Sequence, residues 1–543
     1  MGREDLIVGE RLKKIEELRK KGIDSYPHKY EPKNYSSEIK EKHSKLKNDE
    51  RAKDYVKIAG RVMTKRDLGK LIFVTLQDSR GKVQVILQKK ETEDGSFELF
   101  KRYVDIGDFI GCEGIVMKTR TGEVSVLSKK IVVLSKSLLP LPEKWHGISD
   151  KEERYRKRYL DLIMNPEVKK VFEKRSIIID SIRELLKKKG FVETDTPYLQ
   201  PLYGGASAKP FETYLNALDM KLYLAVSPEL YLKRLIVGGY DKVFTIARNF
   251  RNEGIDRWHN PEFTMIEIYQ AYADYNDMME LTEDLYVNAC LKANNTTKVS
   301  FKGKEIDFKK PWKRMTMAEA IKKFAGIDVL KMNEKELKEF VKKNHVEIKY
   351  ESWGWMVQGV FEHFCEEKLE QPIFITDHPV ETTPLCKLHR NDKTNRLIER
   401  FEPFCMGTEL ANAYTELNDP IMQRKLLEEQ QKMLKEGNDE ANPLDEDFIN
   451  AIETGMPPTG GLGIGIDRMV ILLTGQESIR DVILFPFMRI ESPFVKEKIS
   501  SKQGFEEKKE NKTQKEKKET KVEEKIDKMV GNAAKKVDKV KKK

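Results

Sequence analysis

The sequence has little cysteine and no long apolar run. Its cysteines are scattered, without the paired spacing of a disulfide framework or a cysteine-based zinc site: Cys112, Cys290, Cys365, Cys386 and Cys405. No segment reaches the roughly 18 consecutive apolar residues of a membrane-spanning helix. The first residues hold neither the apolar core of a secretion signal nor Ser or Thr at position 6. We expect a soluble, cytoplasmic protein that does not associate with membranes.

Net positive charge is small outside the last part of the chain. The net charge is +10, but residues 495–543 alone hold 18 Lys against 10 Asp and Glu. The rest of the chain is therefore nearly neutral, which excludes a generally basic surface. A basic tail attracts polyanions, and a solvated extension without a specific partner is the alternative. Its alternating Lys and Glu predict disorder or a lone helix.

The length of 543 residues suggests about two to four domains. Apolar residues at helical spacing predict an amphipathic helix over 6–22, inside an N-terminal helix and polar segment that ends at residue 53. Five β-rich runs follow, with a helix-compatible stretch, 96–104, after the third: 55–62, 71–76, 83–87, 109–116 and 124–134. This pattern predicts a five-stranded β-barrel of the oligonucleotide-binding kind over 54–137. Residues 138–165 are interpreted as a linker.

A long helix is predicted over 167–190, since Pro166 suits a first helical turn and apolar residues recur at helical spacing up to Gly190. Short strands and helices follow, so we expect a large α+β domain over 166–494.

The segment from Phe250 to Glu253 is the first candidate for binding chemistry. If it continues the preceding strand, Arg251 and Glu253 face one cleft, where a guanidinium suits a phosphate and a carboxylate can accept an adenine amino proton. In a returning strand, Phe263, Met265, Glu267 and Tyr269 share one face. A surface salt bridge is the alternative for the Arg–Glu pair.

Two further segments are candidates. The glycine-rich run 460–465 can approach a ligand or another backbone closely, and Asp467 and Arg468 then begin a helix whose N-terminus favours anions. Tight strand–helix packing alone is the alternative. Glu402 and Glu409 flank a turn and could hold Mg²⁺ bridged to a nucleotide, or could be two solvated acids.

Together, these segments and the long helix resemble the three signature motifs of class II aminoacyl-tRNA synthetases. Residues 152–162, 227–233 and 415–419 look like those of the lysyl-tRNA synthetases, and the resemblance covers roughly residues 8–492. It implies an N-terminal five-stranded OB-fold barrel and a catalytic domain built on an antiparallel sheet with flanking helices. The implied activity activates lysine with ATP to give lysyl-adenylate and pyrophosphate, and then transfers lysine to the 3′ end of tRNA(Lys) for protein synthesis.

The same resemblance implies the residues that handle ATP. Arg251 would bridge the α-phosphate and the substrate carboxylate, and Arg468 would hold the γ-phosphate, so these two are the expected catalytic residues. Glu402 and Glu409 would carry Mg²⁺. The expected ATP-binding residues are Arg251, Asn252, Glu253, His259, Asn260, Phe263, Glu409, Leu410, Gly465, Ile466, Asp467 and Arg468.

An acidic pocket is expected for the amino acid. By resemblance, Glu229 and the Gly205 carbonyl would take the α-ammonium, and Glu416 with Tyr269 the ε-ammonium. The complete expected set is Gly205, Glu229, Glu267, Tyr269, Asn412, Tyr414 and Glu416. Three carboxylates are costly to bury without cations, and lysine brings two ammonium groups. An aspartyl or asparaginyl synthetase would need Lys or Arg in this pocket.

The barrel is expected to read the anticodon. Arg66, Phe73, Gln84 and Glu123 are the implied contacts, because an exposed aromatic on a barrel strand can stack an unpaired base. Phe73 as a core residue is the alternative. The long helix matches the motif that forms class II dimers, so a homodimer is expected. A non-catalytic RNA-binding paralogue is the remaining alternative, and the intact arginines and glutamates argue against it.

Overall fold

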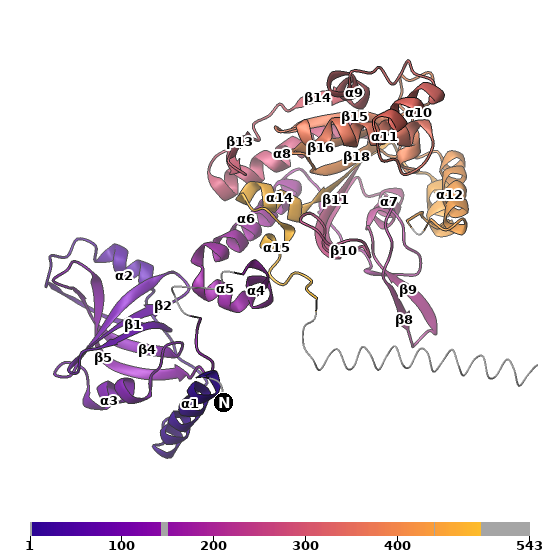
Figure 1. Cartoon of the computed structure of the whole chain (residues 1–543). Helices are drawn as coiled ribbons and strands as arrows, with labels where there is room; N and C mark the ends of the chain where they lie inside the picture. Colours follow the sequence, from indigo (N-terminus) through magenta and orange to yellow (C-terminus); the bar gives the residue numbers. More distant parts are fainter. Residues whose placement is uncertain (1–2, 143–149, 439, 490–543) are drawn as a thin grey trace, which may run out of the picture. The chain divides into compact units, whose positions relative to one another are not determined.

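The computed structural model describes residues 3–142, 150–438 and 440–489 (Figure 1). The chain divides into two compact units. The first comprises residues 1–154 and 159–164, and the second comprises residues 155–158 and everything from residue 165 onward. The basic tail, 495–543, lies outside the described residues. Among the helices that are described, none is both long and apolar enough to cross a membrane.

The first unit is a closed five-stranded barrel. Its strands lie in the order β1-β2-β3-β5-β4, and the parallel pairing of β3 with β5 completes the ring. The strands are β1 (Arg51–Asp67), β2 (Leu71–Gln77), β3 (Lys82–Gln88), β4 (Phe109–Lys118) and β5 (Val124–Ser135). Helix α3 (Asp94–Tyr103) follows the third strand. The predicted barrel and its helix are confirmed, although β1 begins earlier than predicted and the short helix α2 (Ser36–Lys42) was missed.

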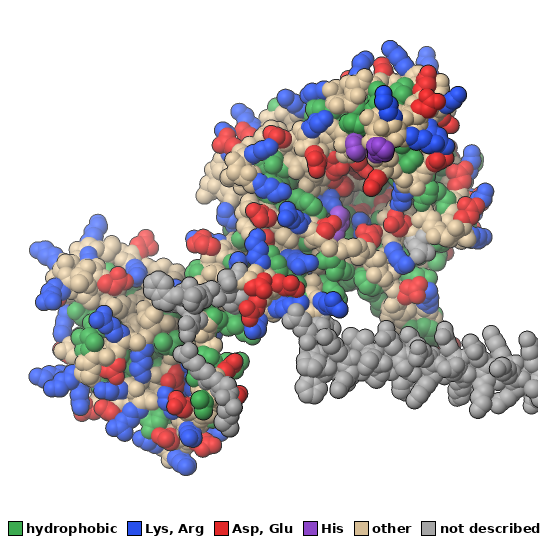
Figure 2. Space-filling view, in the orientation of Figure 1, with side chains coloured by type: hydrophobic (Ala, Val, Ile, Leu, Met, Phe, Trp, Pro, Cys, Tyr) green, Lys and Arg blue, Asp and Glu red, His purple; other side chains and the backbone are tan. Residues whose placement is uncertain are grey.

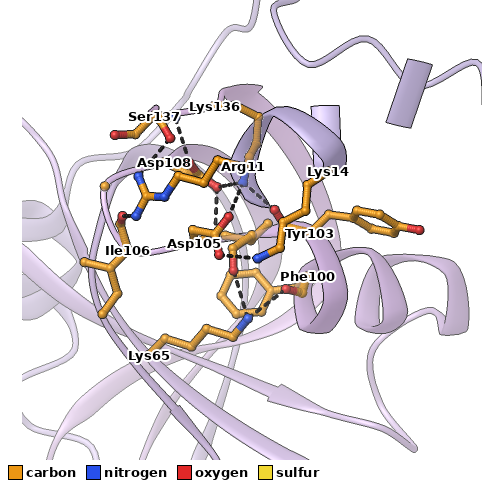
Figure 3. A network of polar contacts seen from close by, with 12 residues as sticks. Arg11, Lys14, Lys65, Phe100, Tyr103, Asp105, Ile106, Asp108, Lys136 and Ser137 are labelled. Carbon is orange, nitrogen blue, oxygen red and sulfur yellow. Dashed lines mark hydrogen bonds and ion pairs between the residues drawn. The ribbon is translucent and has the colours of Figure 1, made fainter. Parts of the chain in front are cut away.

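Helix α1 (Arg3–Lys20) is held against the barrel by buried charges (Figure 3). Arg11 donates hydrogen bonds to the backbone carbonyls of Ile106, Ser137 and Leu139 at 2.9, 2.8 and 3.1 Å. Lys136 is fully buried, and its ammonium contacts the carboxylates of Asp105 and Asp108. The Arg11 hydrogen bonds join the N-terminal helix to the segment that leaves the last strand, and the Lys136 ion pairs tie that segment to the loop between α3 and β4.

The second unit is built on one large mixed sheet. Its main strand order is β14-β15-β16-β18-β19-β11-β10-β6, with β17 paired to β16. The strands are β6 (Val192–Glu193), β10 (Lys242–Phe250), β11 (Glu262–Ala271), β14 (Lys313–Thr316), β15 (Ile373–Pro379), β16 (Leu397–Cys405), β17 (Thr408–Glu409), β18 (Ala411–Thr415) and β19 (Thr459–Gly465). Its central pairs are antiparallel, as predicted, but the pairs β10–β6 and β14–β15 at its two ends are parallel. The predicted catalytic domain on an antiparallel sheet with flanking helices is therefore confirmed, and its two outer strands add parallel pairs because each is reached through a longer connection.

Helices α6 (Pro166–Lys188), α8 (Tyr275–Asn294) and α14 (Ile466–Thr474) pack with the central strands in one apolar core. Ile178, Ile182 and Leu186 of α6 are fully buried in it. The long predicted helix is confirmed, and it ends before Gly190, whose φ of +84° suits glycine. Two short helices, α4 (Lys151–Arg156) and α5 (Arg158–Met164), occupy the region interpreted as a linker.

The remaining elements surround this core. They include two small sheets, β7-β9-β8 and β12-β13, and several further helices (Figure 1). These elements are β7 (Leu199–Gln200), β8 (Glu212–Leu215), β9 (Met220–Leu224), α7 (Glu229–Val237), β12 (Lys298–Phe301), β13 (Lys304–Asp307), α9 (Met317–Ala325), α10 (Glu334–Lys343), α11 (Trp353–Phe364), α12 (Pro420–Lys435), α13 (Glu446–Thr454) and α15 (Ile479–Val482).

Candidate active site

A cavity of about 410 Å³ opens in the second unit beside strands β11, β16, β18 and β19. Figure 2 shows acidic side chains gathered around a hollow in this unit. All but two of the residues predicted to bind ATP, lysine or Mg²⁺ line the cavity. They are Gly205, Glu229, Arg251, Glu253, His259, Asn260, Phe263, Glu267, Tyr269, Glu402, Glu409, Leu410, Asn412, Tyr414, Glu416, Gly465, Asp467 and Arg468.

Asn252 and Ile466 are the two exceptions. Asn252 is exposed, and its backbone N–H donates to the Lys209 carbonyl at 2.8 Å. Ile466 is fully buried in the apolar core under the sheet. Neither side chain lines the cavity, so their predicted contacts with ATP find no support in this arrangement.

The prediction that Arg251 and Glu253 lie on a strand was wrong. Strand β10 ends at Phe250, and the Arg251 backbone N–H donates to the Pro261 carbonyl at 3.0 Å across a loop. Both side chains nevertheless line the cavity. Loop geometry therefore achieves the shared orientation that strand alternation was expected to give.

The returning strand β11 has the predicted alternation. Phe263, Met265, Glu267 and Tyr269 line the cavity, whereas Ile266 and Ile268 between them enter the core. The Arg251 guanidinium lies 5.1 Å from the centre of the Phe263 ring. Burial lowers the pKa of Arg251, yet a guanidinium remains charged after any such shift. One cation and one aromatic face are thus fixed together at one end of the cavity.

Arg468 is anchored by two neighbours. Its Nη1 donates to the backbone carbonyl and to the carboxylate Oε2 of Glu409, each at 3.0 Å. Its Nη2 lies 3.3 Å from His259 Nε2, and His259 Nδ1 lies 2.8 Å from Asp256. With Nε2 accepting from Arg468, the histidine proton resides on Nδ1 and is donated to Asp256. The arginine is therefore oriented before any ligand arrives.

Asp467 has a structural task. Its carboxylate accepts a 2.6 Å hydrogen bond from the Thr264 backbone N–H on β11 and pairs with Arg175 of α6 at 2.6 Å. Asp467 itself is buried at the start of α14. One carboxylate thus joins three elements at the cavity wall, which accounts for the acid at this position without a direct ATP contact.

The two predicted metal ligands each have an arginine partner. Glu402 on β16 contacts Arg400, and Glu409 on β17 contacts Arg468. Met406 and Gly407, both at positive φ, form the turn between these strands, so the predicted flanking arrangement is confirmed. Among the described residues, no cluster of three or more His, Cys, Asp or Glu could hold a metal by itself. Only a metal that takes most of its ligands from elsewhere suits this pair.

Arg400 is a cavity residue that sequence reasoning missed. Its Nε donates to Asn412 Oδ1 at 3.0 Å, and its Nη1 donates to Thr382 Oγ1 at 2.9 Å. Its position two residues before Glu402 on one strand face was the available signal. Because the carbonyl oxygen of Asn412 is occupied, its amide nitrogen remains as the donor for a ligand.

The acidic pocket contains three buried carboxylates. Glu267 accepts from Ser227 Oγ at 2.6 Å and from the Tyr269 hydroxyl at 2.8 Å. Burial, followed by the charge of Glu229, raises the pKa of Glu267. Burial also raises the pKa of Glu229 and of Glu416, against the opposing effect of the Lys233 ammonium. Carboxylates that resist ionisation in this way favour a cationic ligand.

Lys233 is the second functional candidate that sequence reasoning missed. It lies four residues after Glu229 on α7, and its Nζ contacts Glu229 Oε1 at 2.6 Å and also Glu416. A Cβ at Gly461 would lie 1.8 Å from Glu416 Oε1. Glycine at this position is therefore required for the Glu416 carboxylate to occupy its place, which gives a specific reason for one of the predicted glycines.

The predicted anticodon residues lie on the outside of the barrel. Phe73 is half-buried on β2 and pairs with Arg66 on β1, while its neighbours Ile72 and Val74 fill the core. The alternative that Phe73 is a core residue was wrong. Gln84 accepts from Ser125 Oγ at 2.9 Å, and Glu123, which directly precedes β5, pairs with Lys40. An aromatic and several polar side chains thus share one outer face.

Comparison with known families agrees with both units. Residues 150–489 match the model of class II tRNA synthetases (D, K and N), and residues 56–134 match an OB-fold nucleic acid binding domain. The first match covers more than half of the chain and defines its class.

Curated relatives define the family within that class. A lysine–tRNA ligase of Methanoculleus marisnigri is 49% identical over 89% of this chain and 95% of its own. Those of Pelotomaculum thermopropionicum and Carboxydothermus hydrogenoformans are 51% and 50% identical, over 88% and 89% of this chain and 94% and 98% of theirs. The chain belongs to the lysine–tRNA ligase family of class II tRNA synthetases.

Proposed function

We propose that the chain activates lysine with ATP to lysyl-adenylate and pyrophosphate, and then transfers lysine to the 3′ end of tRNA(Lys), for protein synthesis in the cytoplasm. The observation that carries this proposal is the cavity itself. Three buried carboxylates lie in the same cavity as the guanidinium and aromatic ring of Arg251 and Phe263. A dibasic amino acid and a nucleotide fit these two sets of groups.

The chemistry needs position and charge more than proton transfer. The lysine carboxylate oxygen attacks the α-phosphorus of ATP, and pyrophosphate leaves. Arg251 would neutralise both the attacking carboxylate and the α-phosphate, with adenine stacked on Phe263. Arg468, oriented by Glu409 and His259, would hold the γ-phosphate. Preorganised cations in a shielded site lower such a barrier because they need no reorganisation during the reaction.

Glu402 and Glu409 would hold Mg²⁺. The carboxylates of Glu402 and Glu409 suit Mg²⁺, because this ion binds few protein ligands and keeps its remaining coordination positions for water and phosphate. Each carboxylate already has an arginine partner, so a cation there joins an existing charge network. When bound, Mg²⁺ neutralises phosphate charge.

Selection of lysine would follow from charge at both of its ends. Glu416 and Tyr269 would take the ε-ammonium, and Glu229 with the Gly205 carbonyl the α-ammonium. The amide nitrogen of Asn412, oriented by Arg400, would donate to the carboxylate. An uncharged analogue would leave these buried acids unpaired, and sites of this kind discriminate strongly.

ATP–pyrophosphate exchange with lysine, aspartate or asparagine tests the proposal. We expect exchange with lysine alone, because an aspartate side chain would enter a pocket that already contains three carboxylates. Exchange with aspartate, or with none of the three amino acids, would refute the assigned function.

Phe73→Ala should raise the tRNA KM for aminoacylation by about 5- to 150-fold, because base–aromatic stacking contributes roughly 1–3 kcal/mol per base. The lysine-dependent ATP–pyrophosphate exchange should not change, since adenylate formation involves no RNA. The control is Tyr55→Ala, because Tyr55 is an exposed aromatic residue on the neighbouring strand β1. Equal losses in both variants would contradict an anticodon role for Phe73.

A homodimer is also proposed, but its basis differs from the sequence argument. The apolar stripe of α6 is largely buried in the chain's own core. Between positions 177 and 218, however, seven large apolar side chains are exposed: Ile177, Val192, Tyr198, Leu199, Leu202, Tyr214 and Leu218. So many exposed apolar side chains within one segment of the chain favour a partner surface.

Sedimentation velocity at micromolar concentration should therefore give about twice the mass of one chain. Leu199→Asp should shift the species toward the monomer, and Leu330→Asp, an exposed leucine far along the sequence, should not. A fully active monomer would contradict the prediction.

A further inference from the structure

Lys233 is the one lysine of the described residues whose side chain is fully buried among the acids of the lysine pocket. Lys233 lies on α7 and its ammonium contacts the carboxylates of Glu229, on the same helix, and Glu416, which follows β18. The contact with Glu416 therefore joins two elements that are distant in sequence. The carboxylates of Glu229 and Glu416 are also almost completely buried. A buried ammonium is retained at such a place only when its charge is compensated.

The charges facing Lys233 come from several elements. Glu229 on its own helix and Glu416 after β18 contact its ammonium, and Glu267 on β11 lies close to these two carboxylates. The neutral groups nearby are Tyr269, Tyr414, the Cys386 thiol and the Phe448 ring, whose centre lies 6.0 Å from Nζ. Despite desolvation, the two neighbouring carboxylates raise the pKa of Lys233, so its charge is permanent.

These charges give the pocket a definite balance. When all three acids are ionised, three carboxylates against one internal ammonium leave two negative charges, and free lysine carries two ammonium groups. The lysine carboxylate is then balanced by Arg251, on which the proposed function already relies. With lysine bound, the buried groups around its three charged ends reach neutrality, which is the condition for burying ions at low cost.

We propose that Lys233 is a specificity-determining positioning residue, whose ammonium holds Glu229 and Glu416 in place and fixes the surplus of the pocket at two negative charges. This inference rests on the proposed lysine activation. Lys233 itself does not touch the substrate. It acts through the two carboxylates that do, because its charge opposes their protonation and its contacts hold them in place.

Lys233→Met tests the inference, with ATP–pyrophosphate exchange measured across pH. Without the internal cation, the pKa values of Glu229 and Glu416 rise further, so the free pocket takes up protons that lysine must displace. We expect the lysine KM to rise by about tenfold or more at pH 7 and this deficit to shrink toward pH 8.5, with the ATP KM within about twofold of the native value. A lysine KM that is unchanged, or a deficit that is independent of pH, would overturn the inference.

Two further variants separate charge from packing. Lys233→Arg keeps the cation and should restore the lysine KM to within about threefold of native. Lys233→Met combined with Glu416→Gln again leaves two negative charges, so its lysine KM should be no more than about threefold above that of Glu416→Gln alone. This double variant also remains informative if Lys233→Met does not fold. An additive loss, or no rescue by arginine, would overturn the proposal.

Lys136→Met is the matched control, because Lys136 is equally buried and also pairs with two carboxylates, but in the barrel (Figure 3). It should lower the melting temperature and leave the lysine KM and its pH profile unchanged. An equal pH-dependent loss in this variant would assign the effect to general instability. If the native chain does not exchange with lysine, the proposed function fails; if it does and Lys233→Met behaves as native, the inference alone fails.

Discussion

Glu416→Gln should raise the lysine KM in ATP–pyrophosphate exchange by more than about tenfold. The substitution removes one buried partner of the ε-ammonium, a change that costs roughly 2–5 kcal/mol, and 1.4 kcal/mol is a factor of ten. The ATP KM should change by less than about twofold, since ATP is bound by other groups. Exchange kinetics at saturating ATP measure the effect.

Glu283→Gln is the control for this prediction. Glu283 is also buried, but it accepts from the Trp312 backbone N–H at 2.6 Å and does not line the cavity. It should cost stability without changing the lysine KM. If the lysine KM of Glu416→Gln stays near the native value, the role assigned to Glu416 is wrong.

Arg251→Gln should lower kcat of the exchange reaction by about 100- to 1,000-fold, the usual cost of removing one group that stabilises developing charge. The effect should fall mainly on kcat, because Arg251 would contact the attacking carboxylate and the α-phosphate together. Pre-steady-state measurement of adenylate formation would isolate that step.

Arg248→Gln is the corresponding control, because Arg248 lies three residues earlier on β10, is partly exposed and pairs with Glu262. It should retain nearly native kcat. A loss in Arg251→Gln that appears only in the ATP KM would show that Arg251 binds the nucleotide without acting on the reacting groups.

Local patterns predicted the elements whose periodicity is strong. The alternation along 71–76 and 263–269 identified both the strands and the faces of their side chains, because one face of each strand lies against a core. The loop that carries Arg251 was misassigned to a strand, since its conformation depends on Pro261, ten residues later. The parallel pairs at the ends of the large sheet likewise depend on strands that are remote in sequence.

The residues of the candidate site likewise divide into those that the sequence identified and those that depend on contacts formed only by folding. Its acidic and glycine residues were identified through family resemblance, whereas Lys233 and Arg400 were missed because each interacts with groups brought close only by folding. The spacing of Glu229 and Lys233 fits one helix face, but surface ion pairs have the same spacing. For α6, helical periodicity predicted the apolar stripe correctly and could not tell whether this chain or a second copy covers it.

The carboxylate of Asp467 has a consequence for local motion. To expose the Thr264 amide to solvent, a fluctuation must separate α14 from β11 and leave Asp467 and Arg175 without their buried partners. Such an opening costs far more than fraying of an exposed loop. Slow hydrogen exchange at Thr264, beside rapid exchange in the exposed segment 252–257, would therefore be the dynamic signature of a cavity with one rigid wall and one adaptable rim.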